Sequence, residues 1–387
     1  MNILASGLEW FSDRPGGLPR YFSEYLTAWT GQGEEASALV RVPPQSPQAS
    51  RPSYVQGLPL DSKNPIAVRR AWKTTFEEEL KRSSFDVFNP HFAYYAWGWL
   101  DVRSTIPMVT HFHGPWAYES LVENDGQNRV KKSLEFNLQR WIERSVYRNS
   151  NRFIVLSQAF RDELASHYGV PVERIHIISG AVDTNRFTDS FARQRVRKAL
   201  HIPEDRFVLL TVRRLARRMG LENLIHAMAN LRESFPDVLL LIVGGGRLYD
   251  ELRVLTSRLH VQDSIRFTNR VPDEVLPLYY QAADLSVVPT VALEGFGFVT
   301  VESMACGTPA AGTPIGGTKE ILENFDANLL FAGATTEDLV SGLGRLLRDR
   351  TQIPSRSATR NHVLNHYTWD VVIPQIRHVF EAAGAGR

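Results

Sequence analysis

The chain has 387 residues, of which 43% are hydrophobic and 22% charged, a composition typical of a globular protein with two or three domains. Its formal net charge of +2 is too small to indicate nucleic-acid binding. With Cys306 as its one cysteine, the chain excludes an internal disulfide bond and a cysteine-rich metal site, which suits a reducing cytoplasmic setting.

The first residues do not have the pattern of a secretion signal. The short apolar run over residues 1–6 is interrupted at once by Gly7 and Glu9. The longest apolar stretches, such as Val238–Val243, are far shorter than the roughly 20 residues that a membrane-spanning helix needs. We therefore expect a cytoplasmic protein that is at most peripheral to the inner face of the membrane.

Short apolar runs alternate with amphipathic segments along the whole chain, which predicts parallel strands covered by helices on both faces. The first series of predicted strands comprises Asn2–Ser6, Ala38–Val42, Asp86–Phe88, Met108–Phe112, Phe153–Leu156 and Ile175–Ile178. The second series comprises Phe207–Val212, Val238–Val243, Ile265–Phe267, Leu285–Val288 and Pro309–Ala311. The segment Val42–Pro65 is rich in Pro and Ser and is expected to be a loop.

These two series predict two doubly wound α/β domains. The segment Gly180–Arg193 lacks periodicity and is the expected linker, so we place one domain at residues 1–187 and the other at 188–369. The apolar spacing after Thr368 predicts a last helix over residues 370–387, which we expect to pack on the first domain. Apolar residues at helical spacing from Leu221 to Leu231 predict a helix of the second domain.

The run from Glu294 to Glu302 reads EGFGFVTVE and follows the predicted strand Leu285–Val288. It therefore lies at the carboxyl end of a strand, where open α/β sheets bind their ligands. Its two glycines allow a tight turn, and a helix beginning near Phe298 would direct its positive end at a phosphate. The two carboxylates can accept hydrogen bonds from sugar hydroxyls. Two solvated carboxylates are the alternative, which the glycine pattern disfavours.

With the flanking segments Ala283–Leu285, Gly307–Pro309 and Gly316–Glu320, this run resembles the signature of the family-4 retaining glycosyltransferases of GT-B fold. The resemblance extends over most of the chain and is densest from about residue 205 to 332. It implies two Rossmann-like doubly wound domains that face a central cleft. The first domain would lie on the acceptor side, and the second would bind the nucleotide sugar.

In that family the second Glu of this run binds the nucleotide ribose, and the first contacts the donor sugar. The resemblance therefore implies that Glu302 is a donor-binding residue and that Glu294 is a catalytic one. Backbone groups of the run would meet the pyrophosphate, at Gly295, Phe296, Gly297, Phe298 and Val299.

A second element, Val212–Gly220, reads VRRLARRMG and places four arginines between a strand and a helix, where they can clamp a pyrophosphate. By itself it equally fits a solvated basic loop. The family usually has Gly-Arg-Leu-x-x-x-Lys-Gly here, which implies that Arg214 is the catalytic residue that stabilises the leaving diphosphate. The chain departs from this pattern at Arg213, in place of Gly, and at Met219, in place of Lys.

Met219 cannot bind phosphate. Arg218 or Arg217 must therefore take the part of the missing lysine, or the donor binds more weakly than is usual. Arg218 is the residue that we expect to bind the donor.

Two elements of the first domain also follow predicted strands. The run Pro15–Tyr21 reads PGGLPRY and resembles the family's N-terminal Gly-Gly loop, which implies that Gly16 and Gly17 bind the donor; alone, it is a common turn signal. In Thr110–Gly114, His111 and His113 lie on one face of a strand. A histidine pair at this spacing can bind a metal ion, but a third metal ligand is not evident in the sequence.

The family places a His at this strand end, near the donor's sugar and phosphate. The resemblance therefore implies that His113 is catalytic, donating a hydrogen bond to developing charge. For His91, at another strand end, a cleft-lining and a structural role are equally open.

Two further turns of the second domain resemble the family's base-binding region, although either one alone is weak evidence. The turn VGGGR implies that Gly246 and Arg247 lie near the nucleotide base. The turn NRVPD implies that Arg270 and Val271 present backbone groups to it.

The segment Arg129–Arg148 has six basic and two acidic residues, with apolar residues interleaved at helical spacing. Such a helix can lie on an anionic membrane. An ordinary surface helix with a core stripe is the interpretation that we favour, the stripe being Leu134, Leu138, Trp141, Ile142 and Val146.

The expected reaction is transfer of a hexosyl-type sugar from a nucleoside diphosphate sugar to an acceptor hydroxyl, with retention of the anomeric configuration. UDP is the favoured nucleotide and GDP the second, from family frequency. The chain has no Asp-x-Asp motif, so we expect protein cations rather than a metal ion to stabilise the leaving diphosphate, and we expect no cofactor. The acceptor, whether carbohydrate, lipid-linked or a small molecule, is left open.

Two other classes remain as alternatives. A sugar-nucleotide epimerase or hydrolase of similar fold would consume donor without an acceptor, and a non-catalytic binding homologue would show no turnover. A Rossmann oxidoreductase is disfavoured because no complete Gly-x-Gly-x-x-Gly follows a predicted strand.

Overall fold

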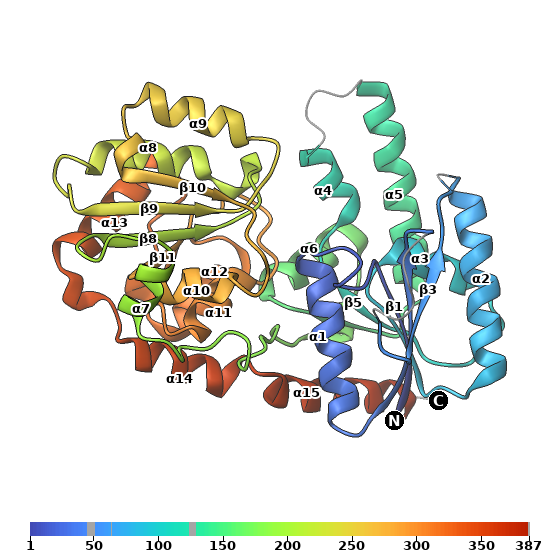
Figure 1. Cartoon of the computed structure of the whole chain (residues 1–387). Coiled ribbons are helices and arrows are strands. Elements are labelled where there is room, and N and C mark those ends of the chain that lie inside the picture. The colour runs from blue at the N-terminus through green and yellow to red at the C-terminus, as the bar shows by residue number, and fades with distance from the viewer. Residues whose placement is uncertain (45–50, 63, 124–128, 386–387) are drawn as a thin grey trace. The chain divides into compact units, whose positions relative to one another are not determined.

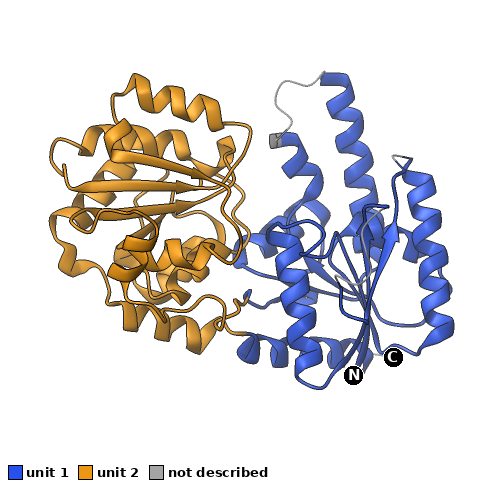
Figure 2. Cartoon of the chain, in the orientation of Figure 1, with its two compact units in different colours: residues 1–180, 369–387 blue, residues 181–368 orange. Residues whose placement is uncertain are grey.

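The computed structural model describes residues 1–44, 51–62, 64–123 and 129–385 (Figure 1). It divides the chain into two compact units (Figure 2). Unit 1 consists of residues 1–180 and 369–387, and unit 2 consists of residues 181–368.

Unit 1 contains a four-stranded sheet of order β3-β2-β1-β4 and a three-stranded sheet of order β5-β6-β7, counted over the described residues. All of these strand pairs are parallel, and a parallel bridge from Phe88 to Met108 links the two sheets. The strands are β1 (Asn2–Gly7), β2 (Glu35–Val42), β3 (Val55–Pro59), β4 (Val87–Pro90), β5 (Val109–Phe112), β6 (Arg152–Val155) and β7 (Ile175–Ile177).

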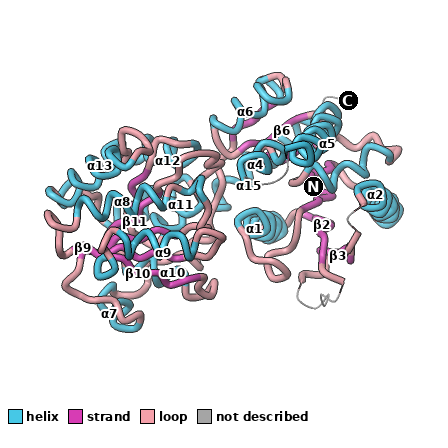
Figure 3. Tube along the Cα trace, turned by 90° about the horizontal axis from the view of Figure 1, so that it is seen from above, coloured by secondary structure: helices cyan, strands magenta, loops and turns pink. Residues whose placement is uncertain are grey.

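Helices cover both faces of the unit 1 sheets. The helices are α1 (Gly17–Gly31), α2 (Pro65–Arg82), α3 (Ala93–Ala96), α4 (Trp116–Glu123), α5 (Arg129–Asn149), α6 (Gln158–Tyr168) and α15 (Trp369–Gly384). Figures 1 and 3 show α1 and α2 on opposite faces of β1–β3. The C-terminal helix α15 packs on α1, where the rings of Trp29 and Phe380 lie 5.4 Å apart.

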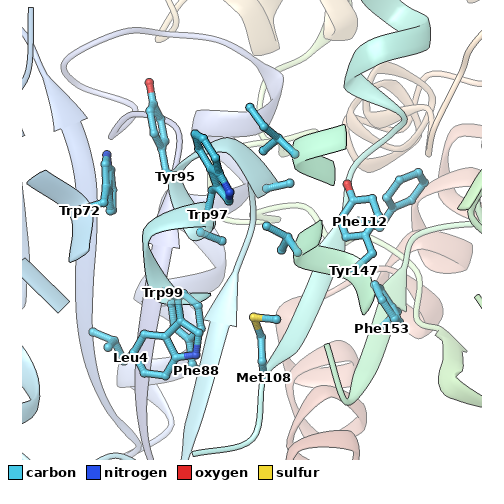
Figure 4. Close-up of a cluster of buried hydrophobic side chains, with 14 of the residues drawn as sticks. Leu4, Trp72, Phe88, Tyr95, Trp97, Trp99, Met108, Phe112, Tyr147 and Phe153 are labelled. Atoms are coloured by element: carbon cyan, nitrogen blue, oxygen red, sulfur yellow. The ribbon is translucent and has the colours of Figure 1, made fainter. Parts of the chain in front are cut away.

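A cluster of aromatic side chains fills one side of this unit (Figure 4). Phe88 of β4 stacks on Trp99 with ring centroids 4.1 Å apart, and Phe112 of β5 meets Tyr147 of α5 edge to face. These rings remove large apolar areas from water and hold the helices of this face against the strands.

Unit 2 contains a five-stranded parallel sheet of order β10-β9-β8-β11-β12. Its strands are β8 (Phe207–Val212), β9 (Val238–Val243), β10 (Ile265–Asn269), β11 (Leu285–Val288) and β12 (Ala310–Gly312). Its helices are α7 (Arg193–Ala199), α8 (Leu221–Leu231), α9 (Tyr249–Arg258), α10 (Leu276–Ala282), α11 (Phe298–Ala305), α12 (Gly316–Phe325), α13 (Thr336–Arg348) and α14 (Arg356–His366). The apolar stripe predicted for α8 is buried.

The predicted loop Val42–Pro65 is wrong in part, because it contains β3 (Val55–Pro59). This strand pairs with β2 at the edge of its sheet. An edge strand has one unpaired side and therefore tolerates the Gly and Pro that suggested a loop. Residues 45–50 and 63 of the segment lie outside the described residues.

The division between the units falls at residues 180 and 181, seven residues before the boundary placed from the sequence. The intervening segment is tied to unit 2 by hydrogen bonds. The Val182 N–H donates to the carbonyl of Tyr367, and Arg360 donates to the carbonyls of Thr184 and Phe187. Residues 181–187 therefore belong to unit 2, because their backbone groups find their partners there.

A fully buried carboxylate, Glu143 of α5, fastens the start of α4. It accepts hydrogen bonds from the backbone N–H groups of Trp116 (2.9 Å) and Ala117 (3.2 Å) and from the hydroxyl of Tyr168 (2.6 Å). Burial raises the pKa of Glu143 to about 7, against the opposing effect of these hydrogen bonds. The folded protein therefore binds this proton more tightly than the unfolded chain does.

Glu143→Gln should change the pH dependence of stability. Because the folded pKa of Glu143 lies above the ordinary value of 4.5, its contribution to stability is present below pH 4.5 and is lost as the pH rises to about 7. The free energy of unfolding of the variant, minus that of the unaltered protein, should therefore increase over this window. Urea unfolding at a series of pH values measures this. Glu135→Gln, at a half-exposed position on α5, is the control. If the free energy of unfolding changes equally with pH in all three proteins, the raised pKa of Glu143 is contradicted.

Candidate functional site

In unit 2 the strand order reverses between β8 and β11. Strand β9 lies on one side of β8, whereas β11 lies on the other. At such a switch point the loops that follow the two strands leave the sheet in opposite directions, and ligands of open α/β sheets bind there. The arginine-rich loop follows β8 and the Glu294 loop follows β11, so the fold brings these two sequence-predicted elements together.

An ion pair joins the two loops. The Arg213 guanidinium lies 2.6 Å from Oε2 of Glu294, and the side chains are 6% and 11% exposed. Thr290 donates to the same carboxylate oxygen at 2.9 Å, and Arg213 donates to the Thr290 hydroxyl. Arg213, which stands where the resembling family has Gly, therefore fixes Glu294 and compensates its charge.

Glu302 lies one turn inside α11, which begins at Phe298 as predicted. It is 5% exposed, and Tyr280 donates to its Oε2 at 2.9 Å. Gly297 precedes the helix with a φ of 90°, a left-handed conformation that favours glycine. The Phe296 side chain is buried against Phe298 and Tyr367, so only the backbone of Phe296 remains for a ligand.

The arginines after β8 point to different partners. Arg217 is exposed and pairs with Glu222 of α8 and Glu251 of α9. Arg218 donates to the carbonyl of Leu293, one residue before Glu294, at 2.7 Å. Of the two candidates for the missing lysine, Arg218 is therefore the one that lies against the Glu294 loop.

Arg214 is exposed at the same strand end, whereas the Met219 side chain is buried. The position at which the family has its lysine thus belongs to the core of unit 2 in this chain.

The two turns expected near a nucleotide base lie beside the arginine loop. The Leu215 N–H donates to the carbonyl of Gly245, and the Gly244 N–H donates to the carbonyl of Asn269. These backbone hydrogen bonds connect the turns that follow β8, β9 and β10. Gly246, Arg247 and Arg270 are exposed and Val271 is partly buried, so all four can be reached from solvent.

In unit 1 the loops after β1, β4 and β5 hold the predicted residues. Gly16 and Gly17 are exposed at the start of α1. Gly16 has an extended φ of −179°, a conformation that any residue can adopt. A side chain at Gly17 would meet nothing within 4 Å, and this leaves open space over the first turn of α1.

A hydrogen-bonded group of three histidines lies at the ends of β4 and β5. Nδ1 of His91 lies 3.0 Å from Nε2 of His113, and Nε2 of His91 lies 3.0 Å from Oδ1 of Asn89. Asn89 also contacts Nδ1 of His111 at 2.9 Å. His91 and His111 are buried, whereas His113 is partly exposed. The question left open for His91 is thus answered: it is internal and does not line an open surface.

Burial lowers the pKa of all three histidines, that of His113 to about 3, so each ring is neutral at pH 7. For His91, the neighbouring histidines lower the pKa further.

Sequence reasoning missed Asn89 as the centre of this group and Tyr280 as the partner of Glu302. Asn89 directly follows an apolar run and was accessible to the same strand-end argument, whereas nothing in the sequence pointed to Tyr280.

Two family models match the chain. Residues 15–186 match the model described as Glycosyltransferase Family 4, and residues 192–363 match the model described as Glycosyl transferases group 1. The two matches follow one another along the chain and cover most of it.

Curated relatives share parts of the sequence. A GDP-mannose-dependent alpha-(1-6)-phosphatidylinositol monomannoside mannosyltransferase of Mycolicibacterium smegmatis is 32% identical over 222 residues, which are 55% of this chain and 58% of the relative. A D-inositol 3-phosphate glycosyltransferase of Streptomyces bingchenggensis is 28% identical over 301 residues, which are 75% of this chain and 64% of the relative. The chain thus spans about three fifths of the length of these two relatives.

Solved structures resemble the whole chain. Sucrose-phosphate synthase of Thermosynechococcus elongatus has a TM-score of 0.82 at 20% identity, with all of both chains covered. Anabaena HepE in complex with UDP and glucose has a TM-score of 0.74 at 19% identity, over 99% of this chain and 100% of that one. At these identities the likeness shows the fold, which is GT-B with two Rossmann-like domains.

Arg213→Ala should destabilise unit 2, because it leaves the Glu294 carboxylate without its cationic partner. We expect the free energy of unfolding to fall by about 1–3 kcal/mol, the cost of an unsatisfied, largely buried group. Arg217→Ala is the matched control, since its ion pairs are exposed and should contribute about 0–1 kcal/mol. Equal losses in urea denaturation would argue against a stabilising Arg213–Glu294 pair.

Proposed function

We propose that this chain, which belongs to the family-4 glycosyltransferases of GT-B fold, transfers a hexosyl-type sugar from a nucleoside diphosphate sugar to an acceptor hydroxyl with retention of configuration. Family membership rests on the two model matches. The observation that carries the chemistry is the meeting of the loops after β8 and β11, where arginines, a fixed carboxylate and the start of α11 lie together.

In the proposed reaction the glycosidic bond of the donor breaks and negative charge develops on the leaving diphosphate. Arg214 and Arg218 would stabilise this charge, together with the backbone groups from Gly295 to Val299 at the start of α11. Such groups act in the transition state because they are already oriented before the charge develops.

The two glutamates would hold the sugars. Glu302, fixed by Tyr280, would accept hydrogen bonds from the ribose hydroxyls, and Glu294, fixed by Arg213 and Thr290, would accept from the transferred sugar. Gly246, Arg247, Arg270 and Val271 would contact the base. In unit 1 we assign substrate contact to His113, Gly16 and Gly17.

The donor is proposed to be a UDP-sugar first and a GDP-sugar second. The names of the relatives supply one case of each: HepE is solved with UDP, and the Mycolicibacterium smegmatis relative is named GDP-mannose-dependent. Thermal shift with a panel of sugar nucleotides distinguishes UDP-sugars from GDP-sugars, because a bound ligand raises the melting temperature according to its excess over Kd.

Turnover that requires an acceptor would support transfer. Acceptor-independent consumption of the donor would favour an epimerase or hydrolase, and no turnover at all would favour a non-catalytic binding homologue.

Arg214→Ala should lower kcat by on the order of 100-fold if its guanidinium stabilises the leaving diphosphate. The measurement is initial-rate kinetics with the donor identified by thermal shift. Arg217→Ala is the control and should keep its activity, because Arg217 is an exposed arginine of the same loop that pairs with Glu222 and Glu251. Comparable rates in both variants would remove Arg214 from the mechanism.

Activity should also persist in excess EDTA. We propose that the arginines after β8, rather than a divalent cation, compensate the diphosphate charge. A loss of activity that added Mg²⁺ or Mn²⁺ restores would refute this part of the proposal.

Peripheral contact with a membrane is a second proposal, and it rests on α5. The expected core stripe of this helix is wrong for Leu134, Leu138 and Trp141, which are 67%, 43% and 53% exposed, whereas Ile142 and Val146 are buried. The apolar residues of α5 therefore lie on two faces of the helix. Ile142 and Val146 lie on the buried face. The exposed face has a stripe of apolar residues spaced by four, four and three positions, namely Val130, Leu134, Leu138 and Trp141.

Basic residues flank this exposed stripe, with Lys131 and Arg148 exposed and Arg144 partly so. Apolar side chains bordered by positive charge match a bilayer surface that contains anionic lipid. No helix among the described residues is long and apolar enough to cross a membrane.

The double variant Leu134→Ser, Trp141→Ser should reduce binding to vesicles that contain phosphatidylglycerol by about tenfold or more, since each removes an apolar group that the bilayer would bury. Co-sedimentation with phosphatidylglycerol vesicles and with purely phosphatidylcholine vesicles measures this. Leu364→Ser, at an exposed leucine of α14, is the matched control. Absence of binding by the unaltered protein would exclude the membrane proposal.

A further inference from the structure

The orientation of the Asn89 amide follows from its neighbours. One side of this amide lies 2.6 Å from the carbonyl oxygen of Val109, which can only accept a hydrogen bond. The amide nitrogen must therefore face Val109, and the amide oxygen must face the opposite way. On that side it meets Nε2 of His91 at 3.0 Å and the hydroxyl of Tyr25 at 3.2 Å.

This orientation determines which nitrogen of each histidine carries the proton. An oxygen of Asn89 facing His91 requires a proton on Nε2 of His91, because two acceptors would otherwise face each other. The ring of His91 is neutral, so its Nδ1 is an acceptor, and Nε2 of His113 must donate to it across 3.0 Å. His113 is also neutral, and its Nδ1 is therefore unprotonated.

Asn89 directs the third ring in the same way. Its amide nitrogen donates to Nδ1 of His111 at 2.9 Å, so His111 is protonated at Nε2. All three rings consequently have the same tautomer, and the hydrogen bonds run in one direction, from His113 through His91 to Asn89 and on to Val109.

We propose that Asn89 and His91 are positioning residues, which hold His113 as the Nε2-protonated tautomer so that its Nδ1 accepts a hydrogen bond from a hydroxyl of the transferred sugar. No described residue bonds to this Nδ1, and His113 is the ring of the three that keeps part of its surface exposed. The inference rests on the proposed function for the identity of the ligand, but the tautomer itself does not.

In this assignment His113 accepts a hydrogen bond from the ligand, whereas the sequence suggested that it donates one. A His113 that donated to developing negative charge would need a proton on Nδ1, and the chain of hydrogen bonds withholds it. An acceptor nitrogen favours a sugar that offers a hydroxyl there and disfavours one that offers a carboxylate, since two acceptors would then face each other.

The tautomer can be read directly by NMR. Long-range ¹H–¹⁵N correlation spectra of the ligand-free protein, labelled with ¹⁵N-histidine, distinguish protonated from unprotonated ring nitrogens, and His113→Gln assigns the resonances of that ring. We expect Nε2 protonated and Nδ1 unprotonated for His113 at pH 7. A proton on Nδ1, or exchange between both tautomers, would overturn the proposal, and neither outcome depends on whether the protein transfers sugars.

Two variants at His91 test the positioning role. In His91→Gln, the amide nitrogen can donate to Asn89 and the amide oxygen can accept from His113, so the variant should keep the tautomer and most of the activity. His91→Leu removes both hydrogen bonds and should lower kcat by about 10- to 100-fold, with a smaller change in the donor KM.

His91→Leu should also release His113 into a mixture of tautomers in the same spectra. If the Leu and Gln variants lose activity equally while both remain folded, His91 does not act through hydrogen bonding and the positioning role is excluded.

Discussion

Parallel strand pairing is the constraint on which the rest of this molecule depends. Every strand pair that the structure describes is parallel, so each strand must be followed by a crossover before the next one can begin. The carboxyl ends of all strands in a sheet then lie at one edge, and the loops that follow them are gathered there. Residues far apart in sequence, such as Arg213 and Glu294, meet for this reason.

The two units satisfy the polar groups at these edges in different ways. In unit 2 the nearly buried carboxylate of Glu294 is compensated by a guanidinium and a hydroxyl. In unit 1 the histidines are neutral, and His113, His91 and Asn89 form a directed chain of hydrogen bonds that ends on a backbone carbonyl, whereas Nε2 of the buried His111 has no partner among the described residues. Both arrangements avoid the large cost of an unpaired buried charge. Both also fix the orientation of a group that we assign to the substrate, which is what preorganisation requires.

Much of the fold was accessible from local patterns. Continuous apolar runs marked β8, β9 and β11 with the bounds that the structure shows, and helical spacing marked the buried face of α8. The edge strand β3 was missed because Gly57 and Pro59 are typical of loops and its pairing partner is remote in sequence. On α5, periodicity could not separate a stripe that faces the core from one that faces solvent, since both repeat with the same spacing.

The sequence by itself determined the two α/β halves, the strand ends that carry polar residues, and the family, because these depend on short-range periodicity and on contiguous motifs. Only the tertiary structure decided the partners of those polar residues. Arg213 looked like a departure from a motif until its guanidinium was found against Glu294, and the sequence did not indicate that His113 contacts His91 or that His91 contacts Asn89. The physical reason is that the direction of a hydrogen bond or the compensation of a charge is set by neighbours in space, and sequence spacing carries no record of them.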